Sequence, residues 1–163
     1  MAGQRRGGPR GLAPFIRFFD ADLSTPVSTL VRTMEELRAG AVAVIASRHA
    51  PGGRIVQPQP LGRRLGGSAF RALARPLVPT IHDTQCGFKF FQRETVQAAA
   101  RRCQLDGFAF DVELLRHVQA SGGRIVELPV EWHDDRRSTF NPVRDGVASF
   151  AAVFQLYRMA VTL

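Results

Sequence analysis

Two aspartates separated by a single residue, Asp20 and Asp22, follow a short apolar run at Phe15–Phe19. A short apolar run that ends in acidic residues is typical of a buried strand with functional groups at its carboxyl end. Two carboxylates with this spacing can converge on one hard divalent cation, Mg²⁺ or Mn²⁺, whose remaining ligands are commonly phosphate oxygens and water. A solvated acidic turn before a helix is the alternative, because carboxylates are stabilised at the positive end of a helix dipole.

A second candidate site is the segment Asp83–Lys89, which places an acid, a hydroxyl, an amide and a cation within seven residues. These groups could bind or polarise a substrate from one loop. The alternative is a structural turn in which Asp83 caps the backbone and Gly87 provides a kink.

Two further polar segments are candidates. Asp111 and Glu113 fall in the first turn of an expected helix at Phe110–Ala120, where acidic residues are also favoured for purely structural reasons. The segment Trp132–Ser138 follows an expected strand and either lines a cleft or forms a solvated loop.

The charge distribution predicts an anionic partner. The net charge is +8, with 21 arginines and one lysine, Lys89, a preference for arginine that a GC-rich coding bias explains. Between Glu36 and Asp83 there is no carboxylate, whereas seven arginines occur: Arg38, Arg48, Arg54, Arg63, Arg64, Arg71 and Arg75. Such a stretch favours contact with phosphate, nucleic acid or a lipid surface, and the sequence does not choose among them.

The elements that position these residues alternate between strands and helices. Strands are expected at Phe15–Phe19, Ala41–Ala46, Gly87–Phe91 and Arg124–Val130, and helices at Pro26–Ala39, Leu61–Leu77, Glu94–Arg102, Phe110–Ala120 and about Pro142–Thr162. Gly40 is expected to stop the first helix, and Pro51–Pro60 to form a loop. This alternation predicts an α/β fold with a mostly parallel sheet flanked by helices.

The length of 163 residues fits one domain. Residues 1–14 are basic and rich in glycine and proline, which predicts a disordered leader before a domain at 15–163. The domain ends in an amphipathic helix, whose apolar stripe comprises Val143, Val147, Phe150, Phe154, Tyr157 and Val161. This stripe either packs on the domain core or contacts a membrane surface or a partner helix.

Taken in order, the strings FFDADLSTP, ASR, DTQCGFKFF, GFAFDVELL and PVEW resemble family 2 glycosyltransferases of the GT-A fold, which is Rossmann-like. The most similar subgroup is the dolichyl- and polyprenyl-phosphate β-glucosyltransferases, and the resemblance covers about Phe15 to Asp145. It implies an inverting, metal-dependent enzyme that transfers glucose from a nucleotide diphosphate sugar, such as UDP-glucose, to a polyprenyl or dolichyl phosphate. The implied location is the cytoplasm, peripherally at the cytoplasmic face of a membrane.

The resemblance also implies roles for individual residues. Asp20 and Asp22 match the motif that holds Mg²⁺ or Mn²⁺ and the diphosphate. The implied catalytic residues are Asp83, Gln85, Asp111 and Glu113, of which Asp111 is the general base if the acceptor is a hydroxyl rather than a phosphate. The implied substrate-binding residues are Arg48, Arg63, Arg64, Lys89, Arg136, Arg137 and Ser138.

The chain departs from the family before the first aspartate motif. Members normally begin with a VIPAYNE-like and a VVDDGSxD-like motif, which bind the uracil and ribose, and neither is in this sequence. We therefore expect the first nucleotide-binding βαβ half of the fold to be absent from this chain. The alternative function is a non-catalytic remnant that binds a membrane or a partner protein through its basic and apolar helices. No nucleic-acid partner is expected, because the chain has no nucleic-acid-binding motif.

Overall fold

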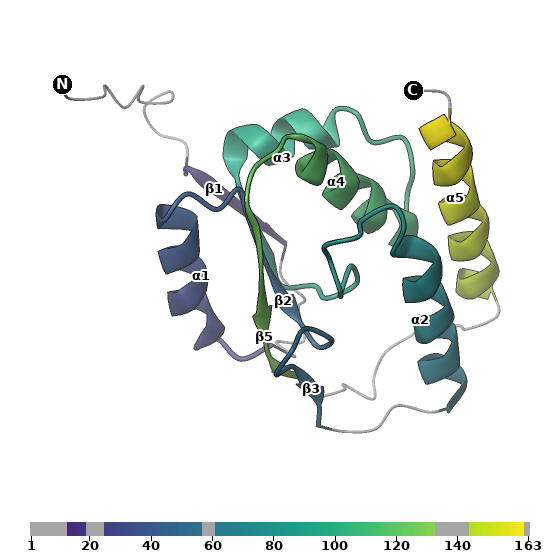
Figure 1. The fold of residues 1–163 in the computed structure, drawn as a ribbon, viewed down its shortest axis with the longest axis horizontal. Coiled ribbons are helices and arrows are strands. Elements are labelled where there is room, and N and C mark those ends of the chain that lie inside the picture. Colours follow the sequence, from purple (N-terminus) through teal and green to yellow (C-terminus); the bar gives the residue numbers. More distant parts are fainter. Residues whose placement is uncertain (1–12, 19–24, 57–60, 133–143, 162–163) are drawn as a thin grey trace.

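Strands and helices alternate along the chain as the hydropathy pattern predicts (Figure 1). The computed structural model describes residues 13–18, 25–56, 61–132 and 144–161, without the side chains at positions 63, 144–148, 160 and 161. Its elements are β1 (Phe15–Phe18), α1 (Thr29–Arg38), β2 (Ala43–Ser47), β3 (Arg54–Ile55), α2 (Leu61–Ala74), β4 (Lys89–Gln92), α3 (Arg93–Ala100), α4 (Phe108–Ala120), β5 (Ile125–Pro129), β6 (Glu131–Trp132) and α5 (Arg144–Val161). Every expected helix and strand is present, and Gly40, at a φ of +93°, ends α1 as predicted.

Four strands form the main sheet in the order β1-β4-β2-β5. β2 pairs in parallel with β5, whereas β4 is antiparallel to both β1 and β2. Three of the four strands therefore share one direction, which confirms the mostly parallel sheet. The reversal of β4 was not predicted, and neither was the small parallel pair β3-β6.

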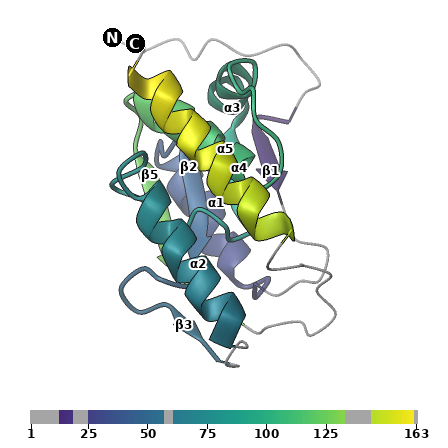
Figure 2. The same cartoon turned by 90° about the vertical axis from the view of Figure 1, so that its right-hand side faces the viewer.

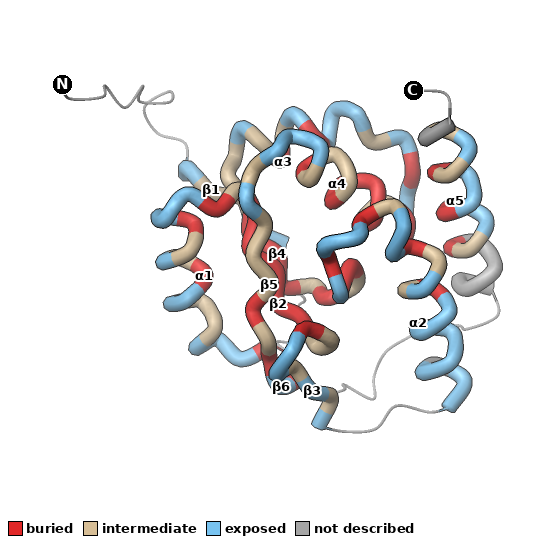
Figure 3. Tube along the Cα trace, viewed as in Figure 1, coloured by how far each residue is buried: buried red, intermediate tan, exposed pale blue. Residues whose placement is uncertain are grey.

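Helices cover both faces of this sheet (Figures 1 and 3). Along β2, Ala43 and Ile45 belong to the apolar core shared with α2, α3, α4 and α5, while Val44 and Ala46 face the core shared with α1. All five residues of β2 are buried, which is why this strand is almost entirely apolar. On the larger side α3 and α4 lie next to the sheet, and α2 and α5 lie side by side outside them (Figure 2). The expected α/β architecture is thus confirmed.

The C-terminal helix α5 packs on the core. Val153 and Leu156 are fully buried, and the Tyr157 hydroxyl donates a hydrogen bond of 2.6 Å to the Leu73 carbonyl on α2. Of the predicted stripe, Phe150 and Tyr157 pack against the core, whereas Phe154 is 58% exposed. No described helix is both long and apolar enough to cross a membrane.

The functional segments meet at one edge of the sheet. Phe18, at the end of β1, pairs with Lys89, at the start of β4, and Ser47, at the end of β2, pairs with Pro129, at the end of β5. The carboxyl ends of β1, β2 and β5 therefore lie together, where ligands bind in open α/β sheets.

Gly123, just before β5, lies so close to Val42 that a larger residue there should lower stability. The Val42 amide donates to the Arg124 carbonyl at 2.9 Å, and a Cβ at Gly123 would lie 2.2 Å from Val42 Cγ1. Because a β-branched valine adjusts poorly, we expect Gly123→Ala to lower the free energy of unfolding by about 1–3 kcal/mol in urea titrations.

Gly66→Ala is the matched control, since a Cβ at this position of α2 would meet no atom within 4 Å. This change should raise stability by roughly 0.5–1 kcal/mol, because alanine is the better helix former. Equal stabilities of the two variants would contradict the close contact at Gly123.

Candidate active site

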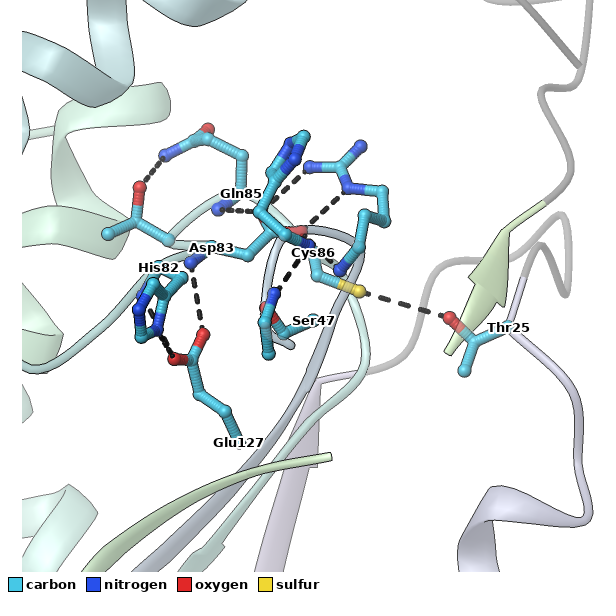
Figure 4. Close-up of polar contacts among 11 residues, drawn as sticks. Thr25, Ser47, His82, Asp83, Gln85, Cys86 and Glu127 are labelled. Atoms are coloured by element: carbon cyan, nitrogen blue, oxygen red, sulfur yellow. Dashed lines mark hydrogen bonds and ion pairs between the residues drawn. The ribbon is translucent and has the colours of Figure 1, made fainter. Parts of the chain in front are cut away.

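A buried ion pair joins two of the predicted site residues, Arg48 and Asp83 (Figure 4). Arg48 follows β2, and Asp83 lies in the loop before β4. Asp83 Oδ2 accepts hydrogen bonds from the Arg48 backbone amide at 3.0 Å and from its Nε at 2.8 Å, and Oδ1 accepts one from Nη2 at 2.8 Å. Since Asp83 is wholly buried, this contact fixes both the guanidinium and the backbone after β2.

The environment makes Asp83 a stable carboxylate. Burial by itself would raise its pKa, but the hydrogen bonds and positive charge of Arg48, with a smaller effect of His49, lower the pKa to about 2. Its oxygens are also occupied, since Oδ1 accepts the Gln85 amide at 3.2 Å. Such a group is a weak proton acceptor at neutral pH. Its three hydrogen bonds instead fix the position of Arg48.

Glu127 on β5 is a further member of the site, and it was not predicted from the sequence. Its Oε1 accepts the Asp83 amide at 3.0 Å, and its Oε2 accepts the His82 amide at 2.9 Å and contacts His82 Nδ1 at 2.6 Å (Figure 4). The available signal was one acidic residue within the otherwise apolar run IVELPV. A carboxylate that is largely withdrawn from water requires partners of this kind.

The loop before β4 is also tied to the start of α4. Gln85 Nε2 donates to the Phe108 carbonyl at 3.1 Å, and Lys89 Nζ donates to Asp111 Oδ1 at 2.8 Å. Lys89 is buried and Asp111 is half-buried. The structure thus brings together three predicted residues, Gln85, Lys89 and Asp111, and makes Lys89 and Asp111 an ion pair.

Glu113 is oriented differently from Asp111. It is 1% exposed, and its Oε2 accepts the backbone amides of Gln104 and Leu105, each at 2.9 Å. Its contacts are therefore with the loop between α3 and α4, while Asp111 contacts β4. The catalytic role implied for Glu113 stays a prediction, and the contacts seen are those of a loop anchor.

A basic cavity of about 310 Å³ lies beside the Arg48–Asp83 pair. It is lined by His49, Ser68, Arg71, Ala72, Arg75, Ile81 and His82, with no carboxylate among them. Burial lowers the pKa of His49, Asp83 acts in the opposite direction, and Arg71 and Arg48 lower it further. Because these cations crowd one another, an anion in the cavity would be stabilised.

Asp20 and Asp22, the aspartates predicted to bind a metal, lie outside the described residues, but both neighbouring segments are described. Phe18 pairs with Lys89, and Thr25 Oγ1 lies 3.9 Å from Cys86 Sγ. The nearest described residues on either side of the aspartate motif, Phe18 and Thr25, therefore both contact the Asp83–Lys89 segment. Two carboxylates with this spacing suit Mg²⁺ or Mn²⁺. Among the described residues there is no cluster of three or more potential metal-ligating side chains.

The other predicted substrate-binding residues are only partly placed. Arg64 is exposed on α2, whereas the Arg63 side chain and residues Arg136, Arg137 and Ser138 lie outside the described part. Of the polar segment Trp132–Ser138, only Trp132 is described. Its ring lies beneath the Arg48 guanidinium, 5.1 Å from ring centroid to Cζ.

Comparison with known proteins identifies sugar transferases as relatives. The chain is 32% identical over 130 residues to the glycosyltransferase AglD of Haloferax volcanii. It is 29% identical over 125 residues to a dolichyl-phosphate β-glucosyltransferase of Trichomonas vaginalis and 31% identical over 134 residues to an undecaprenyl-phosphate mannosyltransferase of Micrococcus luteus. No protein-family model matches the chain.

These matches cover 78%, 73% and 80% of this chain, but 20%, 37% and 53% of the respective relatives. The chain thus spans between a fifth and about half of the length of these relatives. The resemblance to family 2 glycosyltransferases, and to the dolichyl- and polyprenyl-phosphate enzymes among them, is confirmed.

The buried pair predicts a specific acid sensitivity. Replacing Asp83 by asparagine leaves Arg48 buried without its counter-ion, so we expect Asp83→Asn to lower the free energy of unfolding by about 3–5 kcal/mol at pH 7. The pKa of Asp83 falls from 3.8 to about 2 on folding, so its stabilisation is complete above pH 4 and disappears as the pH falls towards 2. Urea unfolding from pH 7 to 2 should show this loss, of roughly 2 kcal/mol, in the wild type and not in the variant.

Glu36→Gln is the control, because Glu36 forms an exposed ion pair with Arg124 at 2.8 Å. Its loss should cost less than about 1 kcal/mol. A similar, small effect of both substitutions would contradict the importance of the buried pair.

Proposed function

We propose that this chain, a homologue of the polyprenyl- and dolichyl-phosphate sugar transferases over three-quarters of its length, is part of an enzyme with that activity. The proposed reaction transfers glucose from a nucleotide diphosphate sugar, such as UDP-glucose, to a polyprenyl or dolichyl phosphate. The observation that carries this proposal is the position of the Arg48–Asp83 pair. It lies at the carboxyl edge of the sheet, between the segments that flank the aspartate motif and the basic cavity.

Asp20 and Asp22 are proposed to bind the donor through Mg²⁺ or Mn²⁺, which would neutralise charge on the diphosphate as it departs. The position of the neighbouring residues supports this assignment. Phe18 and Thr25, the nearest described residues on either side of the aspartate motif, contact Lys89 and Cys86, which follow Asp83 in the chain. The donor diphosphate would then lie close to Arg48.

A phosphate acceptor places modest demands on acid–base catalysis. A lipid phosphate is already ionised near neutral pH, so its oxygen can attack the anomeric carbon without a strong general base. This requirement agrees with a site in which Asp83 has a pKa of about 2 and Asp111 is paired with Lys89. The chain must instead hold an anion, and Arg48, Arg71 and Arg75 at and around the basic cavity supply the charge.

The proposed chemistry is a single in-line displacement. A phosphate oxygen forms a bond to the anomeric carbon while the bond from that carbon to the diphosphate oxygen breaks. The nucleoside diphosphate leaves with the bonding electron pair, and the configuration at the anomeric carbon inverts. No covalent bond to the protein is required, so the described side chains act by orienting two anionic substrates.

Helix α2 supports a peripheral contact with a membrane, which a lipid acceptor requires. Leu61 is 74% exposed and Leu65 is 72% exposed, and the basic Arg64 lies between them on the same helix. Apolar and basic side chains on one exposed helix bind the surface of an anionic bilayer. This feature also favours the alternative function, membrane or partner binding without catalysis.

Calorimetric titration with UDP-glucose and Mn²⁺ tests the proposed donor site. We expect binding that requires the metal and that weakens by about tenfold or more in an Asp20→Ala/Asp22→Ala variant. Turnover is then measured with a polyprenyl phosphate. A folded chain that binds no donor would contradict the proposed activity of this chain alone and favour the alternative.

Sedimentation with vesicles of phosphatidylglycerol tests the membrane contact. A Leu61→Ser/Leu65→Ser variant should lose much of its binding, by about tenfold, because two exposed leucines no longer enter the bilayer interface. The matched control is Val27→Ser/Val31→Ser, which removes two exposed apolar side chains from the α1 region, across the sheet. Equal binding by both variants would argue against a contact through α2.

A further inference from the structure

One side chain of β5, Glu127, holds the loop that carries Asp83. Its two oxygens accept the consecutive backbone amides of His82 and Asp83, at 2.9 and 3.0 Å. The side chain of Glu127 is 9% exposed, and its backbone pairs with Ile45 on β2. The carboxylate is therefore carried by a strand whose backbone is tied to β2.

From Glu127 the contacts continue to Arg48 without interruption. The Asp83 amide is held by Glu127, and the Asp83 carboxylate holds the Arg48 guanidinium and backbone amide. The guanidinium also lies over the Trp132 ring, with Cζ 5.1 Å from the ring centroid. Arg48 is thereby in contact with the loop before β4 and with β6. Glu127 contacts His82 and Asp83 of the same loop (Figure 4).

Withdrawing the Glu127 carboxylate from water is unfavourable, and the strand does not need a carboxylate at this position to form. The neighbours of Glu127 along β5 are Val126 and Leu128, and an apolar residue would also suit a strand of this sheet. Departures from the expected apolar pattern concentrate at functional sites. Glu127 belongs to no motif of the sequence resemblance, and its partners are all within the loop next to the basic cavity.

We propose that Glu127 is a positioning residue that acts through Asp83 to orient Arg48 for binding a phosphate group. The proposal rests on the proposed function, in which Arg48 meets the phosphate of a substrate. Glu127 itself touches no substrate in this scheme. Two other roles are possible outcomes of a test: a purely structural anchor, and a proton relay through His82.

The first measurement needs no ligand. In the full chain, NMR gives the rate at which the Arg48 Nε–H and the amides of His82 and Asp83 exchange with water. In Glu127→Gln, an NH₂ group must face one of the two amide donors. We expect exchange of all three groups to accelerate by about tenfold or more, because a hydrogen bond to a charged group is lost.

The second measurement uses inorganic phosphate as the probe, titrated into the same proteins. Phosphate affinity should fall by about tenfold in Glu127→Gln, in step with the faster exchange at Arg48. His82→Ala is the matched variant, since it removes the imidazole contact and keeps both backbone amides. It should leave exchange at the Arg48 Nε–H unchanged.

Three results would overturn the proposal. Unchanged exchange at Arg48 in Glu127→Gln would show that Glu127 does not orient it. A uniform loss of protection across all amides would show a purely structural anchor. An effect of His82→Ala equal to that of Glu127→Gln would favour the relay through the imidazole. Failure of the wild-type chain to bind phosphate would instead contradict the proposed function, while the exchange measurement would still decide the role of Glu127.

Discussion

The arrangement of the site depends on the ion pair between Arg48 and Asp83. Its three hydrogen bonds join the end of β2 to the loop before β4, two segments separated by 35 residues. Asp83 is wholly buried, so removing either charge would leave the other in the protein interior without its counter-ion. The pair therefore fixes the start of the segment that carries Gln85, Cys86 and Lys89.

Around this pair, three further charged side chains at this end of the sheet also have partners. Glu127 holds the amides of the same loop, and Lys89 is paired with Asp111 on α4. Three described carboxylates at this edge, Asp83, Glu127 and Asp111, therefore accept hydrogen bonds, whereas the basic cavity beside them has no carboxylate in its lining. A site of this kind is better suited to binding anions than to abstracting protons, which agrees with an ionised phosphate as the acceptor.

Much of the fold follows from local sequence pattern. The helix α1 ends at Gly40, and β2 is a run of apolar residues, as expected for a strand buried on both faces. The direction of β4 was not predictable, because the hydropathy of a four-residue strand is the same in either direction. The exposure of Phe154 was missed because the apolar residues of α5 cover more than one line along the helix, and the packing of the neighbouring helices decides that Val153 and Leu156 are the buried ones.

By itself the sequence determined which chemical groups are present and the order in which they occur. The aspartate motif, the Asp83–Lys89 loop and the arginine-rich segment are local patterns, and local patterns can be recognised without a structure. Only the tertiary structure decided their partners: Asp83 with Arg48, Asp111 with Lys89, and Glu113 with a separate loop. It also added Glu127, which lies 44 residues from Asp83 in the chain. Contacts over such separations are set by strand pairing and burial, and no local spacing encodes them.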